Sequence, residues 1–389
     1  MPTAKTFDDL FDSGPFPHFH KSLGLFRPVG LNIRMRAVMT VLIGWFPLLV
    51  IVAAESIKVP SSIGSFLTDV GIHARSLIAA PLLIISEGIT IGRLEAIVRH
   101  FVTAGLIEER DRPGVRSLFA STRSLTNSTL PEIVAIISAY LIAFVLFQNL
   151  WLLVLRPWAI SNGVGPTFSV AGWWYIFVSM PLLLILFFGW LWRIILWSRF
   201  LINVSRFPLR LVAAHPDRAS GLKFLNASLF AFMPIAFTLS VIAAGSAANR
   251  ILHQGATIED LQKIVVGLVV FVLVLFVSPL LVFIVNLRHQ KVTGVFSYGE
   301  LADKVGRQFE DKWLDNYEKF GSGALEATDF SATTDLYQVV ANVHEMKALP
   351  FELRALVALV VTTLLPFIPV VMMMIPIKQL AQEVIKLLV

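Results

Sequence analysis

Seven long apolar stretches constrain this chain more than any other feature of its sequence. The clearest, VVGLVVFVLVLFVSPLLVFIVN, runs from residue 265 to residue 286 without a charged side chain. A helix needs about 20 apolar residues to cross the hydrocarbon core of a bilayer. We therefore predict an all-α fold, a polytopic membrane helix bundle with about seven transmembrane helices. The predicted spans cover residues 37–55, 71–92, 131–155, 171–195, 225–247, 264–286 and 355–377.

The composition agrees with a membrane protein and excludes several other classes. Of the 389 residues, 56% are hydrophobic and only 15% are charged, against the usual quarter of charged residues in a soluble domain. This excludes an ordinary soluble enzyme, a disordered chain and a nucleic-acid binder. The chain contains no Cys, which excludes disulfides and thiolate metal sites. We expect the lipid bilayer as a partner and no nucleic acid.

The basic residues predict the orientation of the spans. Counted between the spans, Lys and Arg alternate between rich and poor segments, with 25 on one side of the membrane and 7 on the other. Basic residues accumulate in cytoplasmic loops. We therefore predict a cytoplasmic N-terminus and an external C-terminus. The alternation also supports the weakest span, 71–92, which His73, Arg75 and Glu87 interrupt.

This topology divides the chain into four parts. Residues 1–36 form a cytoplasmic N-terminal arm, and residues 37–286 form a six-helix transmembrane region. Residues 287–354 form a small cytoplasmic helical subdomain, which we expect to pack against the inner loops or another subunit. Residues 355–389 supply the seventh span and a short external C-terminal helix.

The cytoplasmic subdomain is predicted to contain two helices. The first is amphipathic, because apolar residues recur at four-residue steps. The second is expected to begin after Ser331 or Thr334. The apolar stripe of the first helix consists of Leu301, Val305, Phe309 and Trp313.

Ionisable residues inside the spans are the strongest functional candidates, because burying a charge in a membrane costs free energy. Arg75 and Glu87 share the second span, but twelve residues separate them by about 18 Å along a helix. Each therefore needs a partner elsewhere, and Arg193, Arg34 and Arg36 are candidates for Glu87. The ion pairs that Arg75 and Glu87 make with other helices either fix helix packing or line a path for an ion or solute.

Other polar residues of the spans are weaker candidates. His73 is predicted to lie close to the outer interface, where a solvated or capping role is favoured over a proton relay. Gln148 and Asn149 lie in the outer half of the third span. Interhelical hydrogen bonding is the default interpretation for such side chains, and lining a polar path is the alternative. Prolines inside the spans, which kink helices, are Pro81, Pro181, Pro234, Pro279, Pro366 and Pro369.

One cytoplasmic segment, residues 196–224, combines basic and apolar residues. Its arginines, Arg199, Arg206 and Arg210, are expected to meet lipid phosphates. Its most compact polar cluster consists of His215, Asp217 and Arg218. This cluster offers a base, a carboxylate and an anion clamp. The structural alternative, a turn that caps the helix leading into the fifth span, is favoured.

The segment HPDRASGLKFL at residues 215–225 resembles HPDRAGGLGFL, found in an uncharacterised family of bacterial multi-pass inner-membrane proteins. RSLIAAPLLIISE at residues 75–87 and the C-terminal stretch that contains MKALPF are similar to that family as well. The resemblance implies a bacterial inner (cell) membrane location and no activity, ligand or catalytic residue. Ser220 and Lys223 replace glycines of that pattern, which relaxes any need for close backbone packing there.

The intramembrane charges and the frequent prolines favour passage of an ion or small solute, by a channel or transporter. The alternative is a non-transporting scaffold or accessory subunit that recruits a cytoplasmic protein partner. No HExxH, GxSxG or Walker motif occurs, so we expect no catalytic residue, no metal site and no cofactor. We also expect a homo-oligomer. A continuous polar cavity reaching Arg75 or Glu87 would favour transport, whereas a dry, fully packed bundle with both charges paired would not.

Overall fold

The computed structural model describes residues 33–148, 157–161, 167–314 and 328–374. It confirms the predicted fold class, because seven of its helical segments are long and apolar enough to cross a membrane. The predicted N-terminal arm, residues 1–36, lies outside the described residues except for its last four. The seven segments are Ile33–Glu55, Val70–Thr103, Glu109–Gln148, Val170–Ser205, Lys223–Gln254, Ile258–Trp313 and Leu353–Met374.

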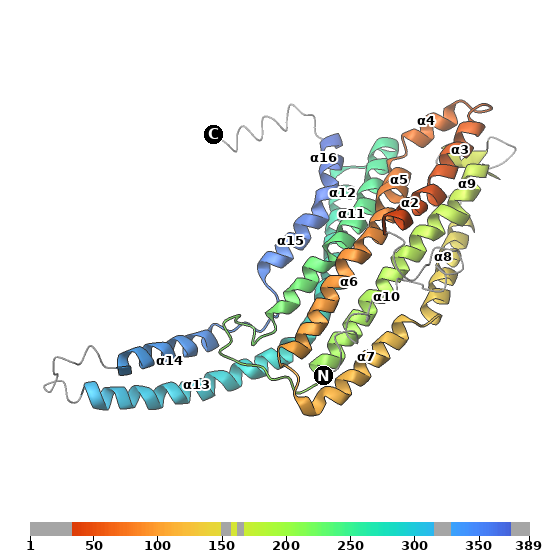
Figure 1. Cartoon of the computed structure of the whole chain (residues 1–389). Coiled ribbons are helices and arrows are strands. Elements are labelled where there is room, and N and C mark those ends of the chain that lie inside the picture. Colours follow the sequence, from red (N-terminus) through yellow and green to blue (C-terminus); the bar gives the residue numbers. More distant parts are fainter. Residues whose placement is uncertain (1–32, 149–156, 162–166, 315–327, 375–389) are drawn as a thin grey trace, which may run out of the picture.

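Each span is built from one or more helices of the bundle (Figure 1). The first two spans and their connection contain α2 (Ile33–Gly44), α3 (Phe46–Glu55), α4 (Ser61–Leu67), α5 (Val70–His73) and α6 (Ala80–Thr103). The third and fourth spans contain α7 (Arg112–Thr126), α8 (Leu130–Gln148), α9 (Val170–Trp174) and α10 (Met180–Ser205). The remaining helices are α11 (Asn226–Gln254), α12 (Ile258–Val277), α13 (Ile284–Trp313), α14 (Thr328–His344), α15 (Leu353–Leu364) and α16 (Ile368–Met374).

Helix α11 lies at the centre of the bundle and packs against α6 and α15. Its neighbours approach closely because its packing face carries small residues. A Cβ atom on Gly245 would lie 2.5 Å from Cβ of Ala74. The helix is followed by its C-cap Gly255, whose φ of 62° is left-handed and accessible to glycine without strain. Thr257 and Asp260 then form a capping box that begins α12.

The structure changes the extent of two predicted elements. The helix of the sixth span continues beyond residue 286, because α12, a 3₁₀ segment (Ser278–Phe283) and α13 follow one another without a loop as far as Trp313. The second helix of the cytoplasmic subdomain begins at Thr328, ahead of the predicted Ser331 or Thr334. The predicted external C-terminal helix lies beyond residue 374, outside the described residues.

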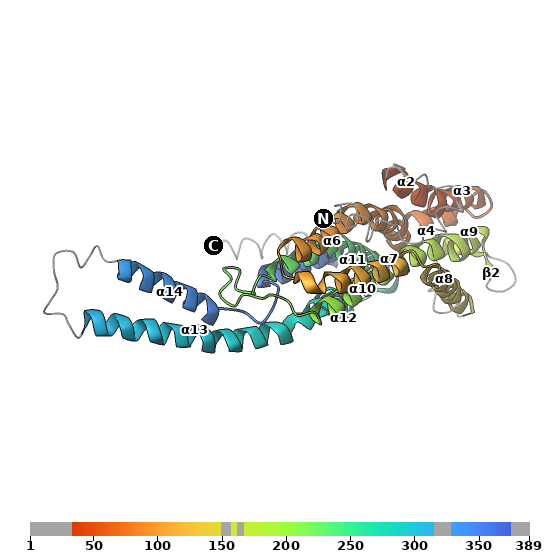
Figure 2. The same ribbon diagram turned by 60° about the horizontal axis from the view of Figure 1, so that its bottom comes forward.

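The subdomain predicted at residues 287–354 is a long helical hairpin in its described part. Helices α13 and α14 pack side by side and project away from the membrane bundle (Figures 1 and 2). The expected packing of this subdomain against the inner loops is therefore limited to its base. There, a Cβ atom on Gly294 would lie 2.5 Å from Cβ of Ala213 and 3.2 Å from Cγ1 of Val343.

Two of the predicted proline distortions take the same form in spans two and four. A π-helical segment, Ala74–Ala79, precedes Pro81, and a second, Tyr175–Ser179, precedes Pro181. Each span begins with a short capped helix, whose caps are Asp69 and Ser169. A proline removes a backbone donor, and the wider π turn accommodates this change. The strands in the described residues, β1 (Ile160–Ser161) and β2 (Thr167–Phe168), form one short antiparallel ladder.

Candidate functional site

Glu87 lies in a buried ion cluster at the meeting point of α2, α6 and α10. Its Oε2 atom is 2.8 Å from Nη1 of Arg36, and its Oε1 atom is 3.4 Å from Nη1 of Arg193. The side chains of Glu87 and Arg193 are each only 5% exposed. Two guanidinium groups from other helices therefore contact one carboxylate in the interior of the bundle, and Glu87 cannot pair with Arg75.

The Arg193 guanidinium is incompletely hydrogen-bonded. It lies over the Trp190 ring, 4.8 Å from the ring centroid, a favourable cation–π position. Its Nη1 atom approaches Glu87 without hydrogen-bond geometry. Among the described residues, neither Nη1 nor Nη2 has a hydrogen-bond acceptor. Buried donors without acceptors are costly, and an anion beside this guanidinium would supply acceptors that the described residues do not.

Arg75 joins the two π-helical segments. Its Nε donates to the carbonyl of Gly71 at 2.9 Å, and its Nη1 donates to the Tyr175 hydroxyl at 3.0 Å. Arg75 and Tyr175 each lie in the first turn of a π segment. π segments occur often at functional sites, but here the arginine has satisfied hydrogen bonds and holds two spans together.

His73 also makes structural contacts. Trp45 Nε1 donates to its Nδ1 at 3.0 Å, and its Nε2 lies 3.1 Å from the carbonyl of Phe66. An indole N–H can only donate, so Nδ1 accepts and Nε2 carries the proton. This tautomer satisfies both ring nitrogens, so His73 links α5 to Trp45 and to the end of α4.

Asp69 is a buried carboxylate that the sequence pattern alone did not single out. It is 2% exposed and accepts hydrogen bonds from Trp158 Nε1 at 3.1 Å and Asn249 Nδ2 at 2.6 Å. It also accepts from the backbone N–H of Ile72. One feature of the sequence could have identified Asp69: it stands just before the predicted second span, and Asp is a preferred residue at the N-terminal cap of a helix.

Neither of the two amides predicted in the third span, Gln148 and Asn149, joins a site among the described residues. Gln148 is the last residue of α8, is exposed, and makes no side-chain hydrogen bond to another described residue. The interhelical bond expected of it is therefore not seen. Asn149 lies outside the described residues.

The cluster of His215, Asp217 and Arg218 is organised by Asp217. Its carboxylate accepts backbone hydrogen bonds from Ala219, Gly221 and Lys223 at 2.8, 3.1 and 3.1 Å. Burial alone would raise the pKa of Asp217, but these three donors, with the neighbouring His215, outweigh burial and hold the pKa below its usual value. The carboxylate therefore folds the turn that leads into the 3₁₀ segment Lys223–Leu225 and α11.

His215 lies against the same carboxylate. Its Nδ1 is 2.8 Å from Oδ1 of Asp217 and 3.2 Å from the backbone N–H of Asp217. Nδ1 accepts from the backbone when it is unprotonated and donates to the carboxylate when it is protonated. Both states support the turn, so His215 is held in position and is not presented as a free base.

The backbone of this turn is strained and is fastened to residues 345–347, which follow α14. Arg218 and Ser220 have φ values of 58° and 55°, an uncommon conformation for residues other than glycine. The carbonyl of Arg218 accepts from the Lys347 N–H at 2.7 Å, and its side chain pairs with Glu345 at 2.7 Å. The Ser220 hydroxyl lies 3.2 Å from the Met346 sulfur. Strain of this kind persists only where surrounding contacts enforce it.

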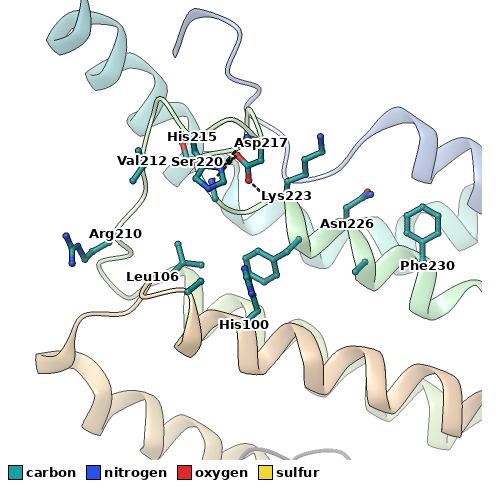
Figure 3. Close-up of a pocket in the computed structure, with 14 residues that line it drawn as sticks. His100, Leu106, Arg210, Val212, His215, Asp217, Ser220, Lys223, Asn226 and Phe230 are labelled. Atoms are coloured by element: carbon teal, nitrogen blue, oxygen red, sulfur yellow. Dashed lines mark hydrogen bonds and ion pairs between the residues drawn. The ribbon is translucent and has the colours of Figure 1, made fainter. Parts of the chain in front are cut away.

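A cavity of about 710 Å³ opens beside this turn (Figure 3). It lies between the end of α6, the start of α11 and the 206–221 segment. His100, Arg210, His215 and Lys223 line it together with apolar side chains such as Phe230. Lys223 is also paired with Glu352. The cavity is therefore amphipathic, and it does not extend to Glu87 or Arg75.

Comparison with protein-family models, with characterised proteins and with solved structures finds no match for this chain. The family resemblance of residues 215–225 therefore stays a prediction. Within the described residues, no group of three or more His, Asp and Glu side chains is arranged to hold a metal ion.

Proposed function

We propose that this protein is a non-transporting membrane scaffold or accessory subunit, whose α13–α14 hairpin recruits a protein partner. The observation that carries this proposal is the exposure of the hairpin. From residue 288 to residue 313, α13 buries only Gly294, and the described part of α14 buries only Thr333 and Val343. Ring contacts such as Phe309–Phe330 join the two helices, but a hairpin that buries so few residues is marginally stable by itself, and a docked partner would bury more of it.

The membrane bundle supports this choice over transport. Glu87 is paired with two arginines, and Arg75 is held by Tyr175 and a backbone carbonyl. Four cavities lined by described residues, beside residues 206–224 and along α10, do not include Glu87 or Arg75. A bundle packed in this way serves as an anchor, from which the hairpin extends.

Removal of the hairpin tests the proposal. Because Gly294 and Val343 lie together at the base, residues 296–341 can be replaced by a short Gly/Ser linker while the base contacts remain. We expect native mass spectrometry of the purified full-length protein to show complexes heavier than one chain, and the shortened variant to lose them. A single-chain mass for the wild type, or complexes that survive the deletion, would contradict the proposal. An unchanged melting temperature of the membrane bundle is the control.

A second candidate function, passage of a small anion, is favoured by Arg193. Its two terminal nitrogens are buried without hydrogen-bond acceptors among the described residues, and an anion would supply them. Anion flux into liposomes that contain the wild type, lost in Arg193→Gln, would favour this candidate over the scaffold. Equal, background flux for both proteins under every imposed gradient would reject it.

We also infer a bacterial inner membrane as the location. The resemblance of residues 215–225 to a bacterial family and the strong asymmetry of basic residues support this inference. Membrane fractionation of bacteria that express the protein, with antibody access to a tag after residue 389 from the external side, tests location and orientation together.

A further inference from the structure

Two cavities meet at the end of α10, and they share Arg199, Asn203 and Arg206. One cavity is small and polar, and the other is a longer apolar groove. The shared residues lie at i, i+4 and i+7, so they fall on one face of the helix. The helix ends at Ser205. The shared residues therefore lie at its last two turns, where the helix leaves the membrane bundle.

The polar cavity, about 330 Å³, lies between α7 and α10. Arg199 donates from Nη2 to the Ser121 hydroxyl at 3.0 Å, but its buried Nη1 has no hydrogen-bond acceptor among the described residues. Arg206 is exposed at the rim, and the exposed Ser117 adds a hydroxyl. No carboxylate of the described residues lines this cavity. Two guanidinium groups and hydroxyls without a counter-charge are suited to a phosphate group.

The apolar groove, about 590 Å³, runs between α10 and α12. Its walls include Ile195, which is 48% exposed, and Val274, which is 61% exposed. Exposed aliphatic side chains on a transmembrane helix face the hydrocarbon of the bilayer. The groove therefore opens to the acyl chains of the lipid and ends at the two arginines.

The third arginine of this segment does not join the junction. Arg210 lines the separate cavity of Figure 3. The sequence predicted that all three arginines meet lipid phosphates, but the structure places only Arg199 and Arg206 at the junction. Substitution of Arg210 is therefore a matched control for substitution of the other two.

We propose that this junction is a binding site for one anionic phospholipid of the leaflet on the basic side. Arg199 and Arg206 hold the phosphate, and one acyl chain occupies the groove between α10 and α12. A phospholipid is favoured over a free phosphate because the groove continues directly from the phosphate-binding residues. Net positive charge favours an anionic lipid over a zwitterionic one. This site is independent of the hairpin and of the proposed scaffold function.

Native mass spectrometry of the full-length protein, titrated with phosphatidylglycerol or phosphatidylcholine, tests the site. We expect preferential binding of phosphatidylglycerol. Because a basic residue at a membrane surface contributes about 1 kcal/mol, Arg199→Gln and Arg206→Gln should each weaken binding about fivefold. Arg210→Gln should leave binding unchanged. Equal binding of the two lipids by the wild type, or equal effects of all three substitutions, would overturn the proposal.

A variant of the groove distinguishes a phospholipid from a free phosphate. Val274→Trp fills the groove and leaves both arginines in the sequence. Val274 and Arg206 are exposed, so Val274→Trp and Arg206→Gln should both retain the wild-type melting temperature. If a phospholipid binds, Val274→Trp weakens phosphatidylglycerol binding and millimolar inorganic phosphate does not compete. If inorganic phosphate competes and Val274→Trp has no effect, the site binds a free phosphate, and the lipid proposal is wrong.

Discussion

Oε2 of Glu87 lies 2.8 Å from Nη1 of Arg36, so an ion pair joins α6 to α2 in the interior of the bundle. The same carboxylate contacts Arg193 of α10. One carboxylate on the second span therefore neutralises buried arginines from two other spans.

Loss of this carboxylate should destabilise the bundle strongly. Glu87→Gln leaves the guanidinium groups of Arg36 and Arg193 without their anion, and breaking a buried pair in this way costs about 3–5 kcal/mol. We expect a clearly lower melting temperature in detergent. Arg193→Met in the Glu87→Gln background should recover part of the loss, because it removes one uncompensated charge. A Glu87→Gln protein as stable as the wild type would show that the cluster is solvated.

Close packing of α11 against the π segment of span two gives a second prediction. A Cβ atom on Gly245 would lie 2.5 Å from Cβ of Ala74. Gly245→Ala should therefore lower the free energy of unfolding by about 1–3 kcal/mol through overpacking. Gly267→Ala is the matched control, because nothing lies within 4 Å of its added methyl group. Gly267→Ala should be neutral or slightly stabilising, since Ala favours helix. Equal melting temperatures for both variants would contradict the close approach of α11 to Ala74.

The turn at Asp217 should respond to acid. The folded-state pKa of Asp217 is lowered, so its contribution to stability is present above the unfolded-state pKa and is lost as pH falls through the folded-state pKa. We expect wild type to be more stable than Asp217→Ala at neutral pH. The difference in melting temperature should persist down to about pH 4, the ordinary range of an Asp pKa, and shrink below it. A difference that is constant across this range would show that the charge of the carboxylate does not stabilise the turn.

The number and approximate position of the spans could be predicted from the sequence, because hydrocarbon thickness fixes the length of an apolar helix. The need of Glu87 for a partner on another helix could also be predicted, since helical geometry separates it from Arg75. The choice of Arg36 and Arg193 among the candidate arginines required the packing of α2 and α10 on α6.

Two features could not be predicted. Asp69 precedes the predicted second span, and its burial depends on Trp158 and Asn249, which are distant in sequence. The projection of the α13–α14 hairpin depends on the continuity of α13 with the sixth span. An amphipathic pattern indicates a helix but does not identify the surface that its apolar face contacts.

Site-specific photo-crosslinking in cells tests the central claim, that the hairpin is a protein-docking element, most directly. A photoreactive amino acid replaces Leu301 or Val339, which are exposed apolar side chains on α13 and α14. The control position is Arg307, an exposed charged residue that helical spacing places on the side of α13 away from α14. We predict a crosslinked protein of one defined mass, a second copy or another chain, at Leu301 and Val339 and not at Arg307. The same weak pattern at all three positions, or crosslinks to lipid alone, would contradict the account.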